Sequence, residues 1–183
     1  GDDYWIDPLK LQKQYDYMES HPECSLCCHN AFRENAEKGR RIGKLRIYDD
    51  SRNASRLHVF RDGGFLPTAS LFYRNALFSE DYHSFPVNSA AGDIRIQCYA
   101  ALVGDVYYLN EAMSVCRINN QSVTHGAKAD VNVAIKRQEI FINWYQEVDK
   151  YTQYHYHQEI DHSIAFCEAR INRLKKKYFK LWN

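Results

Sequence analysis

The sequence predicts an α/β fold that ends in a helical hairpin. Short apolar segments alternate with amphipathic segments over the first two thirds of the chain, and the last third repeats apolar residues at steps of four and three. The 183 residues are enough for one domain with its own core. A hydrophobic content of 45% with 26% charged residues is typical of a soluble globular protein.

The first predicted helix starts at Asp7, a favoured N-cap residue, followed by Pro8, which suits the first helical turn. We expect it to run from Pro8 to about Ser20, where His21-Pro22 stops it. The apolar segment from Cys24 to about Phe32 predicts a buried strand. The stretch that follows predicts three weaker elements, namely a hairpin arm at 44–48, a short helix at 54–60 and a strand at 68–74.

The middle of the chain predicts a loop at 79–92 and then a helix from Asp93 to Val103. Gly104 ends this helix in the usual C-terminal manner. Two short strands are expected after it, at 106–109 and 113–117. Together with the earlier elements, these define a first unit at residues 1–126.

Residues 127–183 form the second predicted unit, a pair of helices joined near Tyr151 to Tyr156. Each helix carries a heptad-like apolar seam, which packs either as an antiparallel hairpin or against a partner chain, as in a homo-oligomer. The seam residues are Val131, Ile135, Gln138, Ile142 and Tyr145 in the first helix, and Ile160, Ile164, Cys167, Ile171, Leu174, Tyr178 and Leu181 in the second.

Charge and cysteine usage exclude several classes. The formal net charge of +1 provides no field that would recruit nucleic acid. No apolar run approaches the roughly 20 residues that a membrane span needs. Cys24, Cys27 and Cys28 lack a second ligand pair at zinc spacing, so we interpret them as small apolar residues of a buried strand. Reduced thiols indicate a cytoplasmic protein.

Asp2 and Asp3 precede the first helix, where paired carboxylates either hold Mg²⁺ or Mn²⁺ or are solvated in a turn. The segment GDDYWIDPLKLQKQYDYMESHPECSLCCHNAF resembles family 2 glycosyltransferases from their acidic metal motif onward. In this resemblance Asp2 matches the second carboxylate of the motif and Asp3 the extra Asp that often follows. The first acidic residue would lie before Gly1. The resemblance therefore implies the C-terminal portion of a larger GT-A enzyme, inactive without its nucleotide-binding half.

Two further segments are similar to signatures of the same family. Residues 91–109 resemble the second signature, in which the Asp that opens the helix is the general base, here Asp93 after Gly92. The plain alternative is a helix cap. The third signature usually shows Tyr-Arg with a His two residues later, and this chain has Cys116, Arg117 and Asn119. Arg117 either binds phosphate or closes a strand and pairs with a surface acid.

Other residues have two interpretations as well. Thr68 and Ser70 resemble the family's strand near the acceptor, where small hydroxyl residues leave room for a sugar, but such residues are also ordinary in sheets. Trp5 either stacks on the sugar or acceptor, or fixes the first helix to the sheet. The cations and aromatics of Lys175–Trp182 suit a membrane interface, or complement the dipole at a helix C-terminus.

The expected function is inverting transfer of a sugar from a nucleotide-diphosphate donor to a glycan or lipid-linked acceptor, as in surface polysaccharide biosynthesis. Asp93 would be the base, and Asp2 and Asp3 would hold a divalent cation, Mn²⁺ or Mg²⁺. Trp5, Thr68, Ser70, Gly92 and Arg117 would bind substrate. Peripheral contact with the cytoplasmic face of a membrane would then follow. The alternative is a non-catalytic oligomerisation or scaffold module built on the helical hairpin.

Overall fold

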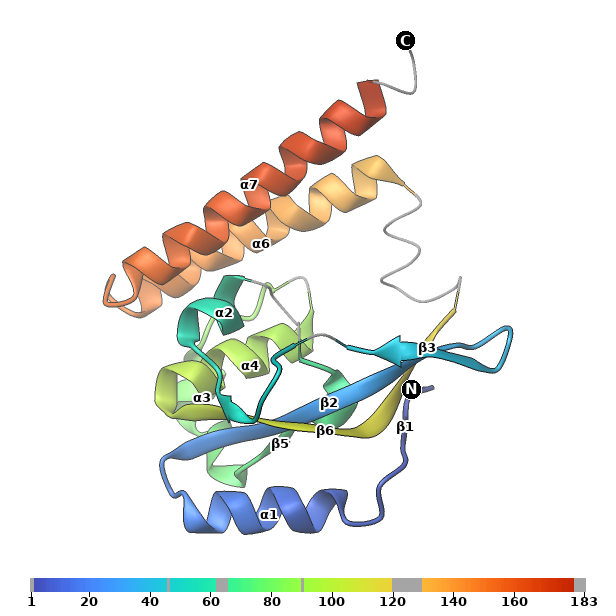
Figure 1. Ribbon diagram of the computed structural model, residues 1–183. Helices are drawn as coiled ribbons and strands as arrows, with labels where there is room; N and C mark the ends of the chain where they lie inside the picture. Colours follow the sequence, from blue (N-terminus) through green and yellow to red (C-terminus); the bar gives the residue numbers. More distant parts are fainter. Residues whose placement is uncertain (1, 46, 62–65, 90, 120–129, 180–183) are drawn as a thin grey trace.

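The computed structural model describes residues 2–45, 47–61, 66–89, 91–119 and 130–179 (Figure 1). Within these residues a six-stranded mixed sheet has the order β1-β6-β2-β3, with β4 paired to β6 and β5 paired to β2. Strands β2 and β6 are parallel, and every other pair is antiparallel. The strands are β1 (Tyr4–Trp5), β2 (Cys24–Asn35), β3 (Arg40–Lys44), β4 (Arg52–Asn53), β5 (Phe72–Tyr73) and β6 (Asp105–Ile118). The predicted α/β class is confirmed.

Helices cover both faces of this sheet (Figure 1). Helix α1 (Lys10–Ser20) lies on one face, while α2 (Arg56–Arg61), α3 (Glu80–Ser84) and α4 (Gly92–Val103) lie on the other. The hairpin of α6 (Val131–Tyr151) and α7 (His157–Phe179) packs outside α2. Two short 3₁₀ helices, η1 (Thr68–Ser70) and η2 (Asn75–Phe78), flank β5.

The larger core lies between the sheet and α2, α4 and the hairpin. Leu26 and Cys28 of β2 contribute to it from the sheet, and Phe60 and Trp144 from the helices. A smaller cluster of Met18, Cys24 and Cys27 lies under α1. Successive strand residues point to opposite faces, which explains why neighbouring cysteines belong to different clusters.

The predicted first helix and the strand after it are confirmed, with adjusted ends. Asp7 Oδ1 accepts a hydrogen bond from Leu9 N at 2.8 Å, and the regular helix starts two residues after Pro8, at Lys10. All three cysteines of β2 are buried, in agreement with their interpretation as strand residues.

Two predicted elements before α3 are wrong in detail. The hairpin arm after β2 lies at Arg40–Lys44 rather than 44–48, because Gly39, at φ +55°, allows an earlier turn. Residues 68–74 do not form a continuous strand. Ser70 donates its hydroxyl hydrogen to Pro67 O at 2.7 Å, which closes the η1 turn and leaves only Phe72–Tyr73 for pairing.

The middle region also differs from the prediction. The 79–92 loop contains α3, and the two strands expected at 106–109 and 113–117 are one strand, β6. His29 pairs with Leu109 and Asn30 pairs with Ala112, so Asn110 and Glu111 form a bulge in an unbroken ladder. A bulge redirects side chains without ending the strand, and its polar residues resemble a loop in the sequence.

The antiparallel hairpin predicted for the last third is present. Gln138 and Tyr145 of α6 and Ile160, Cys167 and Ile171 of α7 are buried within it or against the body of the protein. The boundary predicted at residues 126 and 127 lies outside the described residues, as do Leu181 and Trp182. Within the described part of the chain, no helix combines the length and apolar character needed to cross a membrane.

Candidate functional site

Asp93 lies in the first turn of α4 and is half-buried. Its Oδ2 accepts a hydrogen bond from Thr68 Oγ1 at 2.7 Å, and its Oδ1 lies 3.0 Å from Ile94 N. The N-cap position itself is Ala91, which makes no side-chain capping bond. A Cβ placed on Gly92 would meet nothing within 4 Å, so there is open space beside the residue that precedes Asp93. Asp93 therefore faces η1 across an accessible surface.

Trp5 reaches the same turn from β1. Its Nε1 donates to Ala69 O at 2.9 Å, although 55% of the residue remains exposed. Thr68 and Ala69 are consecutive, so η1 links Trp5 to Asp93 through two hydrogen bonds. The indole is thus fixed to η1 while more than half of the residue stays exposed, and its stacking on a sugar or acceptor stays a prediction.

Ser70 is different from Thr68. It is fully buried, and its hydroxyl is bonded within the η1 turn. Its contribution is to shape the turn that carries Thr68.

Asp2 and Asp3 lie beside the end of β6. Asp3 Oδ1 accepts from Arg117 N at 2.9 Å, and Asp2 Oδ2 accepts from Asn119 Nδ2 at 2.9 Å. Arg117 Nε lies 3.3 Å from Glu34 Oε1, so Arg117 does pair with an acid at the end of a strand. The pairing of β1 with β6 places Tyr4 opposite Val115 and Trp5 opposite Ser114, and the two aspartates directly precede these residues.

The donor set at Asp2 and Asp3 suits a hard divalent cation, which prefers carboxylate oxygens. Among the residues that the structure describes, no three His, Cys, Asp or Glu side chains converge on one metal position. The two carboxylates could therefore supply only part of a coordination shell. A diphosphate ligand has the oxygens to complete it.

Behind Trp5 lies a buried polar pair that the sequence did not reveal. Lys10 is 1% exposed and Gln14 is fully buried. Lys10 Nζ donates to Gln14 Oε1 at 2.7 Å and lies 4.2 Å from the centroid of the Trp5 ring. Gln14 Nε2 donates to Ser70 O at 2.8 Å and to Cys27 O at 2.9 Å. The pair therefore holds both Trp5 and η1 against β2.

The only available signal for this pair was its spacing. Lys10, Gln14 and Met18 recur every four residues and share one face of α1. An inward-facing Lys in a short helix is unusual, and burial lowers the pKa of Lys10 to about 8.

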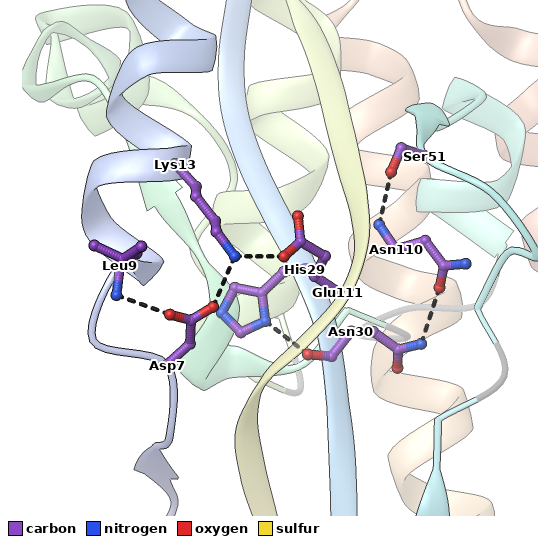
Figure 2. Close-up of polar contacts among 8 residues, drawn as sticks. All are labelled: Asp7, Leu9, Lys13, His29, Asn30, Ser51, Asn110 and Glu111. Atoms are coloured by element: carbon purple, nitrogen blue, oxygen red, sulfur yellow. Dashed lines mark hydrogen bonds and ion pairs between the residues drawn. The ribbon is translucent and has the colours of Figure 1, made fainter.

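A second polar group lies at the N-terminal end of α1 (Figure 2). Lys13 Nζ bridges Asp7 Oδ2 at 2.9 Å and Glu111 Oε2 at 2.5 Å, so the β6 bulge is tied to the start of the helix. The hydrogen bond from Lys13 lowers the pKa of the Asp7 carboxyl, and hydrogen bonds from Glu111 and Asp7 raise the pKa of Lys13.

His29 lies beside this group and is fully buried (Figure 2). Its Nδ1 lies 2.7 Å from Asn30 O, whereas Nε2 has no hydrogen-bond partner among the residues that the structure describes. Burial lowers the pKa of His29 to about 4, so the imidazole is neutral at pH 7.

A pocket of about 370 Å³ opens at Trp5. Its lining comprises Trp5, Ile6, Asp7, Pro8, Lys10 and Leu11. The exposed ring of Trp5 and the carboxylate of Asp7 at one opening are suited to a small polar ligand.

No family model matches the chain. Two similar proteins are the uncharacterised Mb1547 of Mycobacterium bovis and the uncharacterised Rv1520 of Mycobacterium tuberculosis. Each is 32% identical over 130 residues, which are 71% of this chain and 36% of the relative. The chain thus spans about a third of the length of the curated relatives it matches.

Proposed function

We propose that this chain is the acceptor-side part of an inverting glycosyltransferase of the GT-A type. Its substrates would be a nucleotide-diphosphate sugar and a hydroxyl group of a glycan or lipid-linked acceptor. The observation that carries the proposal is the pair of contacts from Asp93 to Thr68 and from Ala69 to Trp5. These contacts gather one candidate base, a hydroxyl and an exposed aromatic ring from three separate elements.

In this reaction the acceptor oxygen bonds to the anomeric carbon while the bond from that carbon to the diphosphate breaks. Asp93 takes the proton from the attacking hydroxyl, which is the role of a positioned carboxylate in general base catalysis. Thr68 orients that carboxylate through its 2.7 Å hydrogen bond. A divalent cation held by Asp2 and Asp3 would supply charge stabilisation for the departing diphosphate. Arg117, at the same end of β6, would add positive charge there.

The test is sugar-nucleotide turnover by the full natural protein that contains these residues. Asp93→Asn keeps an oxygen that can accept from Thr68 but removes the base, so turnover should fall about 10²- to 10⁴-fold with the fold intact. Asp161→Asn, a change at an exposed position of α7, is the matched control and should leave turnover unchanged. Equal turnover in Asp93→Asn and the natural protein would refute the proposed role.

The buried seam of the hairpin does not support the scaffold alternative, although Val133 and Ile140, seven residues apart on α6, are exposed. Its seam residues Tyr145 and Ile160 are already buried by the chain itself, and the Tyr145 hydroxyl donates to Phe60 O of α2. An oligomerisation seam would instead need an exposed apolar stripe.

A lipid-linked acceptor would place the reaction at the cytoplasmic face of a membrane. Lys175 and Lys176 are exposed near the end of α7 and would contact anionic headgroups there. Sedimentation with vesicles that contain phosphatidylserine tests this placement, and absence of binding would remove it from the proposal.

A further inference from the structure

Helix α1 and the segment 69–75 lie side by side over most of the length of the helix. Three contacts mark the path. Trp5 Nε1 donates to Ala69 O just before the helix, Gln14 Nε2 donates to Ser70 O in its middle, and Arg74 donates to Met18 O near its end. The seam between the two segments therefore runs from the surroundings of Asp93 to the C-terminal end of α1.

This seam is open at both ends. The pocket of about 370 Å³ at Trp5 has a counterpart of about 230 Å³ at the other end, lined in part by Tyr15, Glu19, Arg74 and Asn75. Each pocket carries an exposed aromatic residue, Trp5 at 55% and Tyr15 at 52%.

The side chains between the two pockets form one stripe. Leu11, Tyr15 and Glu19 recur every four residues and share one face of α1. At the rise of 1.5 Å per residue, Leu11 and Glu19 are about 12 Å apart along the helix axis. Leu11 is 45% exposed, so the stripe continues from the first pocket to the second. A ligand that used both pockets would be extended rather than compact.

Charges along the seam are balanced. Lys13 is paired with Asp7 and Glu111, and Arg74 lies 3.3 Å from Glu19. Lys10 is buried and donates to Gln14, so it presents little charge to the surface. The two pockets and the stripe between them are called the groove below. Its exposed aromatic residues and paired ionic groups favour a neutral ligand rich in hydroxyl groups over an anionic polymer or an apolar helix.

We propose that this groove binds successive sugar units of a neutral glycan acceptor, whose reacting end lies on Trp5 and whose older units extend along α1 to Tyr15. The assignment rests on the proposed function, because the contact of Trp5 with Ala69 places this end of the groove beside Thr68 and Asp93. Sugar rings have apolar faces that stack on aromatic side chains and edges that hydrogen-bond to carboxylates and amides.

Binding is measured on the full natural protein by isothermal titration with neutral hexasaccharides of glucose, N-acetylglucosamine, galactose and mannose, each beside its monosaccharide. At least one hexasaccharide should bind more tightly than its monosaccharide. Tyr15→Ala should weaken that hexasaccharide about 2- to 12-fold and leave the monosaccharide unchanged, because only the longer ligand reaches Tyr15. Tyr15→Phe keeps the ring and should retain tight binding.

Tyr154→Ala is the matched control, since Tyr154 is a similarly exposed tyrosine at the turn between α6 and α7. It should bind like the natural protein. Equal affinity for hexasaccharide and monosaccharide, an unchanged Tyr15→Ala, or binding of none of the four hexasaccharides would overturn the groove. These readouts are independent of turnover. Length-dependent binding with an active Asp93→Asn would keep the groove and refute the base.

Discussion

The two faces of the sheet bury different kinds of side chain. The face toward α2, α4 and the hairpin buries large aromatic residues, among them Phe60, Phe85 and Trp144. The face toward α1 buries only a small apolar cluster and places Lys10, Gln14 and His29 out of contact with solvent. Burial of apolar area stabilises a fold, whereas burial of polar groups is favourable only when each finds a partner.

One face of the sheet mainly stabilises the fold, and the other mainly positions Trp5 and η1. On the face toward α2, α4 and the hairpin, many apolar side chains contribute to stability, and no single polar contact determines the arrangement. On the α1 side, Gln14 contacts Lys10, Cys27 and Ser70 at once and so determines where Trp5 and η1 lie. Trp5 and its pocket are on the second side, whereas Asp93 comes from α4 on the first. The following changes test whether the division holds.

The largest loss of stability is expected on the face toward α2, α4 and the hairpin. Trp144 is fully buried, packs against Phe85 and donates Nε1 to Pro86 O at 3.0 Å. Trp144→Ala should lower the free energy of unfolding by about 3 to 5 kcal/mol, measured by urea denaturation. Trp144→Phe should lose less because it keeps an aromatic ring. A loss below about 1 kcal/mol for Trp144→Ala would show that the hairpin is only loosely joined to the body.

On the α1 side, His29 should make stability depend on pH. Its pKa is lowered from 6.5 to about 4 by burial, so between these values the unfolded chain binds more protons than the folded one. The contribution of His29 should therefore be constant above pH 6.5 and should lower stability by up to about 3 kcal/mol as the pH drops to 4. Urea midpoints between pH 4 and 8 measure this.

His29→Gln should flatten the pH profile in that window. The Asp7 carboxyl, whose pKa is lowered from 3.8, loses its contribution only below that value and does not overlap. An equally steep profile in His29→Gln would assign the effect to another group.

A third change tests the junction between α4 and β6. A Cβ on Gly104 would lie 2.6 Å from Glu23 O and 2.9 Å from Ser25 Cβ, so the backbone would have to move. Gly104→Ala should cost about 1 to 3 kcal/mol in thermal or urea unfolding. Gly92→Ala is the control, because a Cβ there meets nothing within 4 Å. Similar losses for both would show that helix ends rather than close packing are responsible.

The smallest effect is expected at the start of the hairpin. Asp130 caps α6 by accepting from Asn132 N at 2.8 Å and Val133 N at 3.4 Å. Asp130→Ala should lower stability by about 1 kcal/mol, whereas Asp130→Asn should retain most of it because Asn also caps well. Amide hydrogen exchange in the first turn of α6 checks the local effect, and unchanged exchange in Asp130→Ala would contradict it.

Local pattern was sufficient for the elements that bury one apolar face. The seams of α6 and α7 and the apolar β2 segment determine their own periods, so these elements were predicted nearly to their ends. Local pattern failed where tertiary contacts determine the structure of a segment. In the β6 bulge, Asn110 donates to Asp49 O and accepts from the Tyr108 hydroxyl, and these bonds accommodate it within the strand. Asp49 is far from Asn110 in the sequence, so no local pattern could reveal this contact.

The site divides in the same way. Asp93, Thr68 and Trp5 were identified through a resemblance in sequence, and the structure brings these three together. Lys10 and Gln14 could not be predicted, because polar residues in a helix are ordinarily solvated and their burial depends on η1 and β2.

All six cysteines are free thiols, and five of them are buried, in two apolar clusters and on several different elements. Cys167 belongs to the hairpin, Cys98 to α4, and Cys24 and Cys27 to the cluster beneath α1. A thiol reagent reaches each only after its own layer has opened. Labelling kinetics followed by mass spectrometry would therefore give the order in which the layers separate, without any probe being introduced.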